Sequence, residues 1–259
     1  MHWKTVAEYW DKNAEAWTEL TRAGSDICRD NINTPCFLSM LPEVKGLRGL
    51  DIGCGEGHNT RLVAQRGAMM IAIDVSETFV SHAQATETEK PLNIEYGIAS
   101  ATELPYPDQT FDFVMSTMAL MDIAESDQAL AEAFRVLKRG GFFQFSICHP
   151  CFQTPRWEWV ERDGEIIGII CGDYFKKHNG FVEEWTFSGA PAELVGKHAN
   201  FQVPRFDRTL SEWINSLTSI GFKIDQIEEP IPTEEAAEKH PTLKKYRNIP
   251  FFMHFRCSK

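Results

Sequence analysis

A glycine-rich turn between two apolar stretches constrains this chain more than any other feature. Residues 47–52 form a short apolar run of strand length, Gly53-Cys54-Gly55-Glu56-Gly57 follows, and residues 60–65 have the pattern of a helix opening. Glycines in such a turn adopt positive φ and let a bound molecule approach the backbone. The helix N-terminus adds N–H donors that have no partner within the helix. The sequence therefore predicts a strand–turn–helix cradle for a ligand.

The spacing and charge of the turn indicate which ligand it holds. A dinucleotide site has the spacing G-x-G-x-x-G, whereas the third glycine here comes one residue earlier. The carboxylates of Asp51 and Glu56 would repel a pyrophosphate and attract a cation. Residues 50–57, LDIGCGEG, resemble the first motif of the class I SAM-dependent methyltransferases. S-adenosylmethionine (SAM) carries an ammonium and a sulfonium. A nicotinamide-dependent oxidoreductase on the same sheet topology is the alternative with a different cofactor.

Composition bounds the class of protein. The chain has 259 residues with 43% hydrophobic content, which suits a single globular domain over 1–259. A net charge of −11 disfavours nucleic acid and anionic membrane as partners. No apolar stretch approaches the ~20 residues of a membrane span, and the first residues lack the apolar core of a signal peptide. We therefore expect a cytoplasmic protein with reduced cysteines, which fits their odd number, seven. The oligomeric state is left open.

The order of elements predicts an α/β fold. Apolar runs predict strands at 69–74, 92–98, 113–116, 142–148, 222–227 and 249–256 in addition to the first. Helical spacing predicts helices at 6–20, 30–41, 127–137 and 210–220. The resemblance implies a Rossmann-like, doubly wound seven-stranded sheet of order 3-2-1-4-5-7-6 with an antiparallel seventh strand. It divides the chain into N-terminal lid helices (1–42), a SAM-binding core (45–150), an insertion after strand five that covers the substrate (151–208), and the rest of the sheet (209–259).

The cofactor residues are expected at the strand ends. Asp74 ends the second strand about 20 residues after the first glycine, where a carboxylate accepts hydrogen bonds from ribose hydroxyls. Residues 99–112, ASATELPYPDQTFD, resemble a further family segment, but Ser100 replaces its acidic residue, so the adenine contact would fall to the Ser100 hydroxyl and the Ala101 backbone. The Met118 backbone would contact the methionine part of SAM. The full set implied is Asp51, Gly53, Cys54, Gly55, Asp74, Val75, Ser100, Ala101, Ser116 and Met118.

Methyl transfer is an in-line displacement that needs a base only if the nucleophile must lose a proton. The candidate catalytic residues are His149, just past strand five, and Asp122, past strand four, with Tyr9 of the lid as a further candidate. A subset of methyltransferases has a similar F-S-I-x-H-P-x-F run, a Tyr-Phe pair and an Arg before the next helix. Tyr9, Trp17, Tyr174 and Arg208 are therefore candidate substrate-pocket residues. The alternative is that the lid aromatics anchor a helix and that His149 bonds to backbone.

Two further alternatives concern function. Cys148-His149-Pro150-Cys151 is a C-x-x-C motif, but it leaves a strand and has no second cysteine pair, which argues against redox or zinc roles; no metal is expected. A non-catalytic SAM-binding protein would keep the cradle without a working pocket. The acceptor is expected to be a small molecule, and quinone-like, phenolic, amine and lipid-like classes all stay open.

Overall fold

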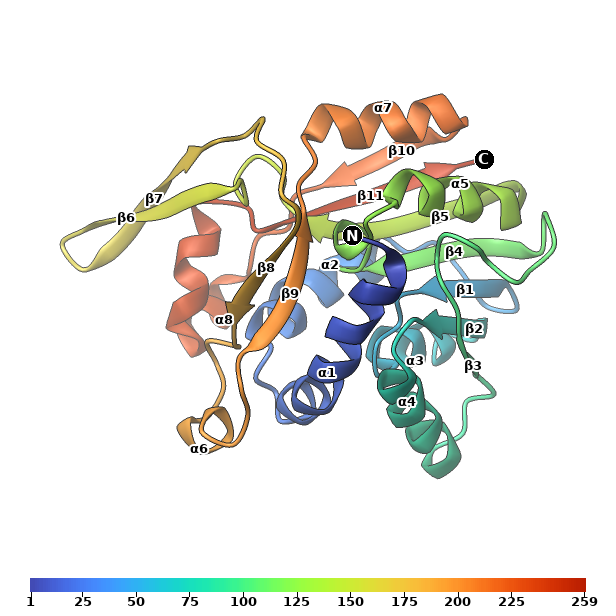
Figure 1. Ribbon diagram of the computed structural model, residues 1–259, viewed down its shortest axis with the longest axis horizontal. Coiled ribbons are helices and arrows are strands. Elements are labelled where there is room, and N and C mark those ends of the chain that lie inside the picture. The colour runs from blue at the N-terminus through green and yellow to red at the C-terminus, as the bar shows by residue number, and fades with distance from the viewer.

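A seven-stranded mixed sheet forms the centre of the molecule in the computed structural model, which describes residues 1–259 except the side chain of Val195. Its order is β10-β11-β5-β4-β1-β2-β3 (Figure 1). The bounds are β1 Arg48–Ile52, β2 Met69–Asp74, β3 Glu95–Ile98, β4 Phe111–Thr117, β5 Leu137–Cys148, β10 Lys223–Glu228 and β11 Phe252–Ser258. β11 is antiparallel to both neighbours, and the other pairs are parallel. The predicted fold and strand order are confirmed.

Both faces of the sheet are covered because its central strands are apolar on both sides. On one face, Leu50, Val114 and Phe145 join a buried cluster with α5 (Ser126–Val136) and α7 (Leu210–Ile220). On the other, Phe113 and Met115 pack against α2 (Thr34–Met40) and α3 (His58–Ala64). α4 (Glu77–Glu89) lies beside β2 and β3. Successive residues of one strand thus serve opposite cores.

Several boundaries differ from prediction. The helix expected at 30–41 is a π-helix, η1 (Arg29–Asn33), followed by α2. β5 begins at Leu137 rather than at 142, because residues 138–141 continue the strand with Gly140 at φ 76° instead of closing α5. β3 is shorter than expected, and β11 is shifted toward the C-terminus. α8 (Glu234–Lys239) and the 3-10 helix η3 (Pro241–Arg247) were not predicted.

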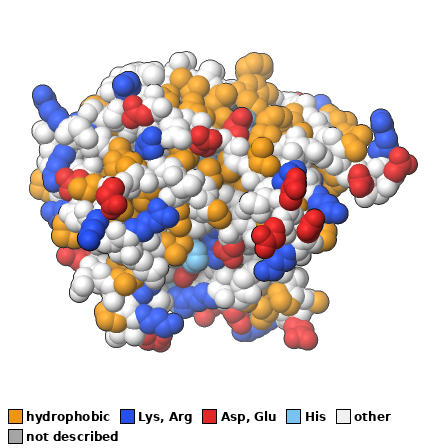
Figure 2. All heavy atoms as spheres, turned by 180° about the vertical axis from the view of Figure 1, so that it is seen from behind, with side chains coloured by type: hydrophobic (Ala, Val, Ile, Leu, Met, Phe, Trp, Pro, Cys, Tyr) orange, Lys and Arg blue, Asp and Glu red, His pale blue; other side chains and the backbone are white. Residues whose placement is uncertain are grey.

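The segment after β5 forms two hairpins. β6 (Arg156–Arg162) pairs with β7 (Glu165–Gly172), and β8 (Asn179–Trp185) pairs with β9 (Phe201–Phe206), with the short α6 (Ala192–Val195) between the latter two. The β6–β7 hairpin projects from the body, whereas β8–β9 lies beside α1 (Trp3–Arg22), which crosses in front of the sheet (Figure 1). Seen from behind, acidic and basic side chains are interspersed with apolar ones (Figure 2). No helix in the described part of the chain is both long and apolar enough to span a membrane.

Candidate functional site

A cavity of about 960 Å³ opens at the C-terminal ends of the parallel strands. Its floor comes from the turn after β1, the ends of β2 and β4, and the segment after β3. Its roof comes from α1, β8 and β9, and η3 adds a further wall. Ligands of open α/β sheets bind at this edge, where the strand order reverses beside β1. The N-terminal helix and the insertion therefore enclose what the sheet would leave open.

The glycines of the cradle have distinct reasons to be glycine. Gly53, Gly55 and Gly57 have φ of 71°, 54° and 87°, in the left-handed region. A Cβ on Gly53 would lie 2.4 Å from the Cβ of Ala119, and one on Gly57 would lie 2.6 Å from the Tyr96 hydroxyl. A Cβ on Gly55 would meet no atom within 4 Å. Packing therefore requires glycine at positions 53 and 57, whereas Gly55 lines the cavity and has open space beside its Cα.

Asp74 presents a carboxylate at the edge of this cradle. Oδ2 accepts a hydrogen bond from the Gly55 amide at 2.8 Å, and Oδ1 accepts one from the Ser76 amide at 3.0 Å. Burial raises the pKa of this carboxyl, and the backbone donors oppose that effect. Each oxygen keeps a lone pair, so the group can still accept from two neighbouring hydroxyls. The geometry fits the expected ribose contact.

The remaining floor residues lie where the sequence places them. Cys54, Val75, Ser100, Ala101 and Met118 all line the cavity. The Ser100 hydroxyl lies 2.8 Å from that of Thr102. Met118 has φ 56°, a left-handed conformation that costs a non-glycine residue on the order of 1–3 kcal/mol. Its amide donates to the carbonyl of Ser146 at 3.0 Å, which helps to hold the strained turn at the cavity.

Asp51 and Ser116 lie beneath the cavity, not in it. Asp51 is fully buried, and its Oδ2 accepts a 2.6 Å hydrogen bond from the Thr60 hydroxyl of α3. Its Oδ1 has no partner among the described side chains. Burial raises the pKa of Asp51 to about 7. The Ser116 hydroxyl donates to the Ile52 carbonyl at 2.8 Å, tying β4 to β1. Neither residue lines the cavity, so the direct ligand contact expected of each is replaced by support of the cradle.

His149 also lies away from the cavity, contrary to its expected place. Its neighbours Cys148 and Pro150 line the cavity, but His149 does not, and its side chain is 2% exposed. Nε2 lies 2.6 Å from Oε1 of Glu229, and Nδ1 accepts from the Cys151 amide. This geometry makes His149 a link between loop and sheet, and we do not retain it as a proton acceptor.

The predicted substrate-pocket residues divide into two groups. Tyr9 and Tyr174 do not line the cavity, and the Tyr174 hydroxyl accepts from the Leu210 amide at 2.8 Å, at the first turn of α7. Arg208 reaches the cavity wall, but its guanidinium bonds to Ser126, Ser216 and Asp127 and covers the Trp213 ring. Arg208 therefore joins α5 to α7. Trp17 lines the cavity.

Trp17 belongs to an aromatic cluster that closes the roof. Its ring centroid is 4.8 Å from that of Phe187, 4.9 Å from Phe201 and 5.6 Å from Trp185. The cluster joins α1 to the β8–β9 hairpin, so the same side chain anchors the helix and faces the cavity. The anchoring role is therefore seen in the structure, and contact with a substrate stays a prediction.

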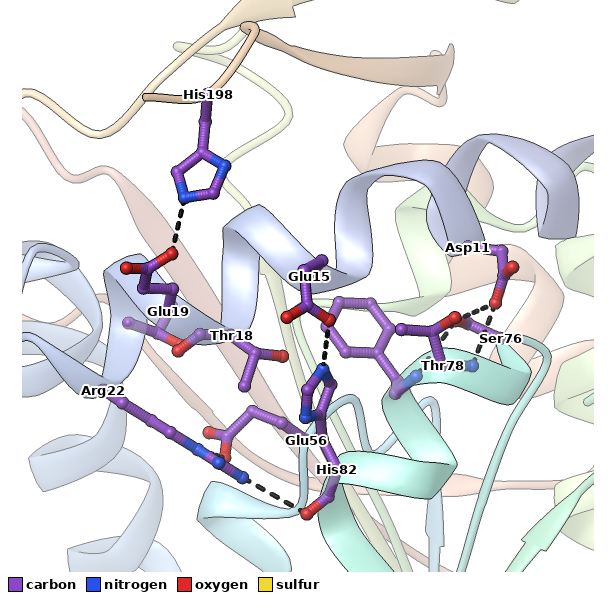
Figure 3. Close-up of polar contacts among 12 residues, drawn as sticks. Asp11, Glu15, Thr18, Glu19, Arg22, Glu56, Ser76, Thr78, His82 and His198 are labelled. Carbon is purple, nitrogen blue, oxygen red and sulfur yellow. Dashed lines mark hydrogen bonds and ion pairs between the residues drawn. The ribbon is translucent and has the colours of Figure 1, made fainter. Parts of the chain in front are cut away.

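Polar contacts fix α1 along its length (Figure 3). Asp11 accepts from the Ser76 hydroxyl at 2.8 Å and from the Thr78 amide at 2.9 Å. Glu15 lies 2.8 Å from His82 of α4, and Glu19 lies 2.7 Å from His198 of the insertion (Figure 3).

At the C-terminal end of α1, Arg22 pairs with Glu56 of the cradle at 3.3 Å (Figure 3). Glu56 is thus neutralised rather than free to attract a ligand. The helix bridges α4, the cradle and the insertion.

Asp122 ends the short 3-10 helix η2 (Leu120–Asp122) and lines the cavity. Burial raises its pKa well above the usual range; Glu183 of β8 adds to this shift, and Arg205 of β9 opposes it. Asp122 is thus the one predicted catalytic residue that faces the space above the cradle.

Sequence reasoning missed the residues that the insertion and η3 bring to the wall, among them Glu183, Arg205 and Tyr246. These segments lack a motif, and their distance along the chain from the cradle gives no signal of proximity. Among the described residues, no group of three or more His, Cys, Asp or Glu is placed to hold a metal ion, and all seven cysteines are free thiols.

Comparison with known proteins decides the family. Residues 50–145 match the model of a methyltransferase domain. A SAM-dependent methyltransferase from Mesorhizobium loti has the same fold, with a TM-score of 0.70 and 28% identity over 87% of this chain and 96% of that one. The chain belongs to the class I SAM-dependent methyltransferases.

Two curated relatives extend the comparison. An uncharacterised protein of Haemophilus influenzae is 26% identical over 92% of this methyltransferase and 91% of its own length. A 27-O-demethylrifamycin SV methyltransferase of Amycolatopsis mediterranei is 32% identical, but the match covers 66% of this chain and only 62% of that enzyme.

SAM is the cofactor of this methyltransferase, and the cavity floor fits it. The Asp74 carboxylate has free lone pairs for a ribose diol, and the Gly55 backbone borders open space. The ammonium and sulfonium of SAM match a floor and wall that carry carboxylates, whereas a pyrophosphate would not. From this fit we propose, as cofactor contacts, the lining residues Gly53, Cys54, Gly55, Asp74, Val75, Ser100, Ala101 and Met118.

Proposed function

We propose that this methyltransferase transfers the methyl group of SAM to a small-molecule acceptor by in-line displacement. The observation that supports it is the continuity of one cavity from the cradle to a chamber under α1 and the β8–β9 hairpin. A cavity of about 960 Å³ lies at the upper end of the range for small-molecule sites, which is roughly 300–1,000 Å³. It has room for a cofactor together with a modest acceptor.

SAM supplies an electrophilic methyl on sulfur, and the protein supplies position and exclusion of water. The floor residues orient the cofactor, and the aromatic cluster around Trp17 keeps solvent from the chamber. Alignment of two reactants in one site can lower the barrier by about 7–11 kcal/mol. Asp122, which lines the cavity, would take a proton if the nucleophile must lose one. The rifamycin relative acts on a small molecule, which is consistent with this class of acceptor.

Calorimetric titration with S-adenosylhomocysteine (SAH), with NADH as the comparison, tests the cofactor half of the proposal. We expect micromolar binding of SAH and none of NADH. Incubation with SAM and an extract of small metabolites, followed by mass spectrometry, tests the transfer. SAH binding without any methylated product would favour the non-catalytic alternative.

We also infer a cytoplasmic location, which rests on the odd number of cysteines, all free.

A further inference from the structure

The Asp122 carboxylate faces the chamber without a partner. No hydrogen bond or ion pair to its side-chain oxygens is formed by any side chain that the structure describes, although the residue lines the cavity beside Cys148. Asp122 is half-buried, so a ligand that fills the cavity and displaces water from this carboxylate must supply a donor to it. The position is the end of η2, directly after the strained Met118 turn that borders the cofactor floor.

Arg205, whose charge acts on Asp122, makes its hydrogen bonds to other groups. Arg205 Nη1 lies 2.7 Å from Glu183 and Nε lies 2.6 Å from Asp207, while Nη2 donates to the Gln153 carbonyl. One guanidinium therefore faces three carboxylates on this wall. The wall keeps an excess of negative charge whenever Asp122 is ionised.

The whole cavity has the same imbalance. Glu56 is paired with Arg22, and six further carboxylates line the cavity against four Lys or Arg side chains: Asp26, Asp74, Asp122, Glu183, Glu184 and Asp207, against Arg29, Arg205, Arg208 and Lys245. Trp17, Trp185 and Phe187 stand over the same chamber. Aromatic faces attract cations, and more strongly where water is excluded. An anionic acceptor would meet like charge at this wall, and a neutral phenol or alcohol would leave the Asp122 carboxylate without a cationic partner.

We propose that the acceptor is a small amine, held as its ammonium ion by Asp122 against the aromatic roof. This inference rests on the proposed function and names its substrate class. The Asp122 carboxylate takes one proton from the ammonium nitrogen. The freed lone pair forms the nitrogen–carbon bond to the methyl group while the carbon–sulfur bond breaks, and its electron pair stays on sulfur. The products are SAH and the methylated ammonium, and the Asp122 proton passes to solvent.

The pKa of Asp122 is shifted upward, and a carboxylate with a higher pKa is a stronger base. This shift suits a group that must take a proton from nitrogen. Glu183 supports this shift from β8, Arg205 limits it from β9, and Cys148 is the ionisable neighbour on β5.

Three probes of similar shape and different charge test the proposal on the protein saturated with SAH: 2-phenylethylamine, 2-phenylethanol and 3-phenylpropanoate. Calorimetry should show the amine binding about 10- to 100-fold more tightly than the alcohol, the range for one hydrogen bond to a charged group. The carboxylate should bind least. Asp122→Asn should abolish the preference for the amine and leave SAH affinity unchanged. Asp173→Asn, an exposed residue of the loop after β7, is the matched control.

The outcomes separate the two proposals. Equal or weaker binding of the amine relative to the alcohol would overturn the substrate class while SAH binding upholds the cofactor site. Failure of SAH to bind would overturn the proposed function itself. If Asp122→Asn weakened SAM but not SAH, which lacks the sulfonium charge, the carboxylate would serve the cofactor instead, and the amine proposal would be rejected.

Discussion

Two buried carboxylates, Asp51 and Asp74, end neighbouring strands and have different roles because their surroundings differ. Asp74 has backbone donors on both oxygens and a face toward the cavity. Asp51 has one hydroxyl donor, from Thr60, and lies under the cradle. A strand-end acid in the sequence is therefore ambiguous: the side on which the strand presents it decides whether it meets ligand or helix.

Asp74→Asn should weaken SAH binding by about 10- to 100-fold, the range for losing a hydrogen bond to a charged acceptor. The amide leaves one acceptor oxygen for the ribose diol and turns the other position into a donor. Calorimetry measures the change. Asp163→Asn is the control. It makes the same chemical change in the β6–β7 turn, at φ 54°, a conformation that Asn tolerates as well as Asp does. Unaltered affinity in Asp74→Asn would remove this residue from the cofactor site.

Alanine at two cradle glycines should separate packing from ligand contact. Gly53→Ala should destabilise the fold strongly, since its Cβ would lie 2.4 Å from that of Ala119. Gly55→Ala should lower the free energy of unfolding by only about 1–2 kcal/mol, the cost of alanine in the left-handed conformation. Its Cβ would meet no protein atom within 4 Å. It should nevertheless lower SAH affinity by narrowing the cradle. Urea unfolding and calorimetry measure the two effects; a Gly55→Ala protein with full SAH affinity would contradict our view of this backbone.

At the scale of elements, local signals predict much of the sheet and little of the roof. Continuous apolar runs predict β2 and β4, and Thr209 with Gly221 brackets α7 as capping box and left-handed C-cap. The start of β5 was missed because a Lys-Arg-Gly-Gly run has the composition of a helix end, yet Leu137 pairs with Phe111 of β4 before this run and Phe142 pairs with Phe113 after it, with a shift of register between them. Tertiary pairing here overrides local propensity.

The tie between α1 and β9 is an element-scale contact that no local pattern predicts. The Asn13 amide donates to the Gln202 carbonyl at 2.9 Å, and its oxygen accepts from the Gln202 amide at 3.0 Å. Asn13 is 5% exposed, so its side chain completes the edge of β9 as another strand would.

Asn13→Asp should therefore loosen the roof, because it removes the donor and buries a charge beside a carbonyl, with a cost of about 1–3 kcal/mol or more. Deuterium exchange should quicken in α1 and β9 and not in β1 and β4. Asn93→Asp, at an exposed position with φ 60°, is the control. If α1 and β9 exchanged at the same rate in the variant as in the parent, α1 would be held by its apolar face alone.

At the scale of the molecule, the site is assembled from segments that are far apart in the chain. The floor follows from the family motif within residues 50–120, so the sequence could name most of the residues that line it. The wall depends on how the insertion folds back over the strand ends, which brings Glu183 and Arg205 toward Asp122. The sequence places both His149 and Asp122 just past strand ends, but the His149 ring is held at Glu229. Side-chain direction after a strand is set by such distant partners.

A buried histidine should make the stability of the whole molecule depend on pH. His254 of β11 is fully buried, and neither ring nitrogen has a partner among the described groups. Burial lowers its pKa from 6.5 to about 3. The unfolded chain therefore binds a proton below pH 6.5 that the folded chain does not, so the contribution of His254 is complete above 6.5 and is lost as the pH falls toward 3. At pH 5 the loss should be about 2 kcal/mol.

Asp51 acts in the opposite direction, because its pKa is raised to about 7, so the folded state regains stability as the pH falls from 7 toward 3.8. A comparison of variants isolates the histidine, since the Asp51 contribution is common to both proteins. Urea unfolding at pH 7 and pH 5 measures the effect. Relative to the parent, the free energy of unfolding of His254→Leu should rise by about 2 kcal/mol between pH 7 and pH 5. His240→Leu, at a partly exposed position, is the control. Parallel stability curves for parent and His254→Leu would mean that the buried ring finds a proton acceptor, and the assignment of an unpaired neutral imidazole to β11 would have to be abandoned.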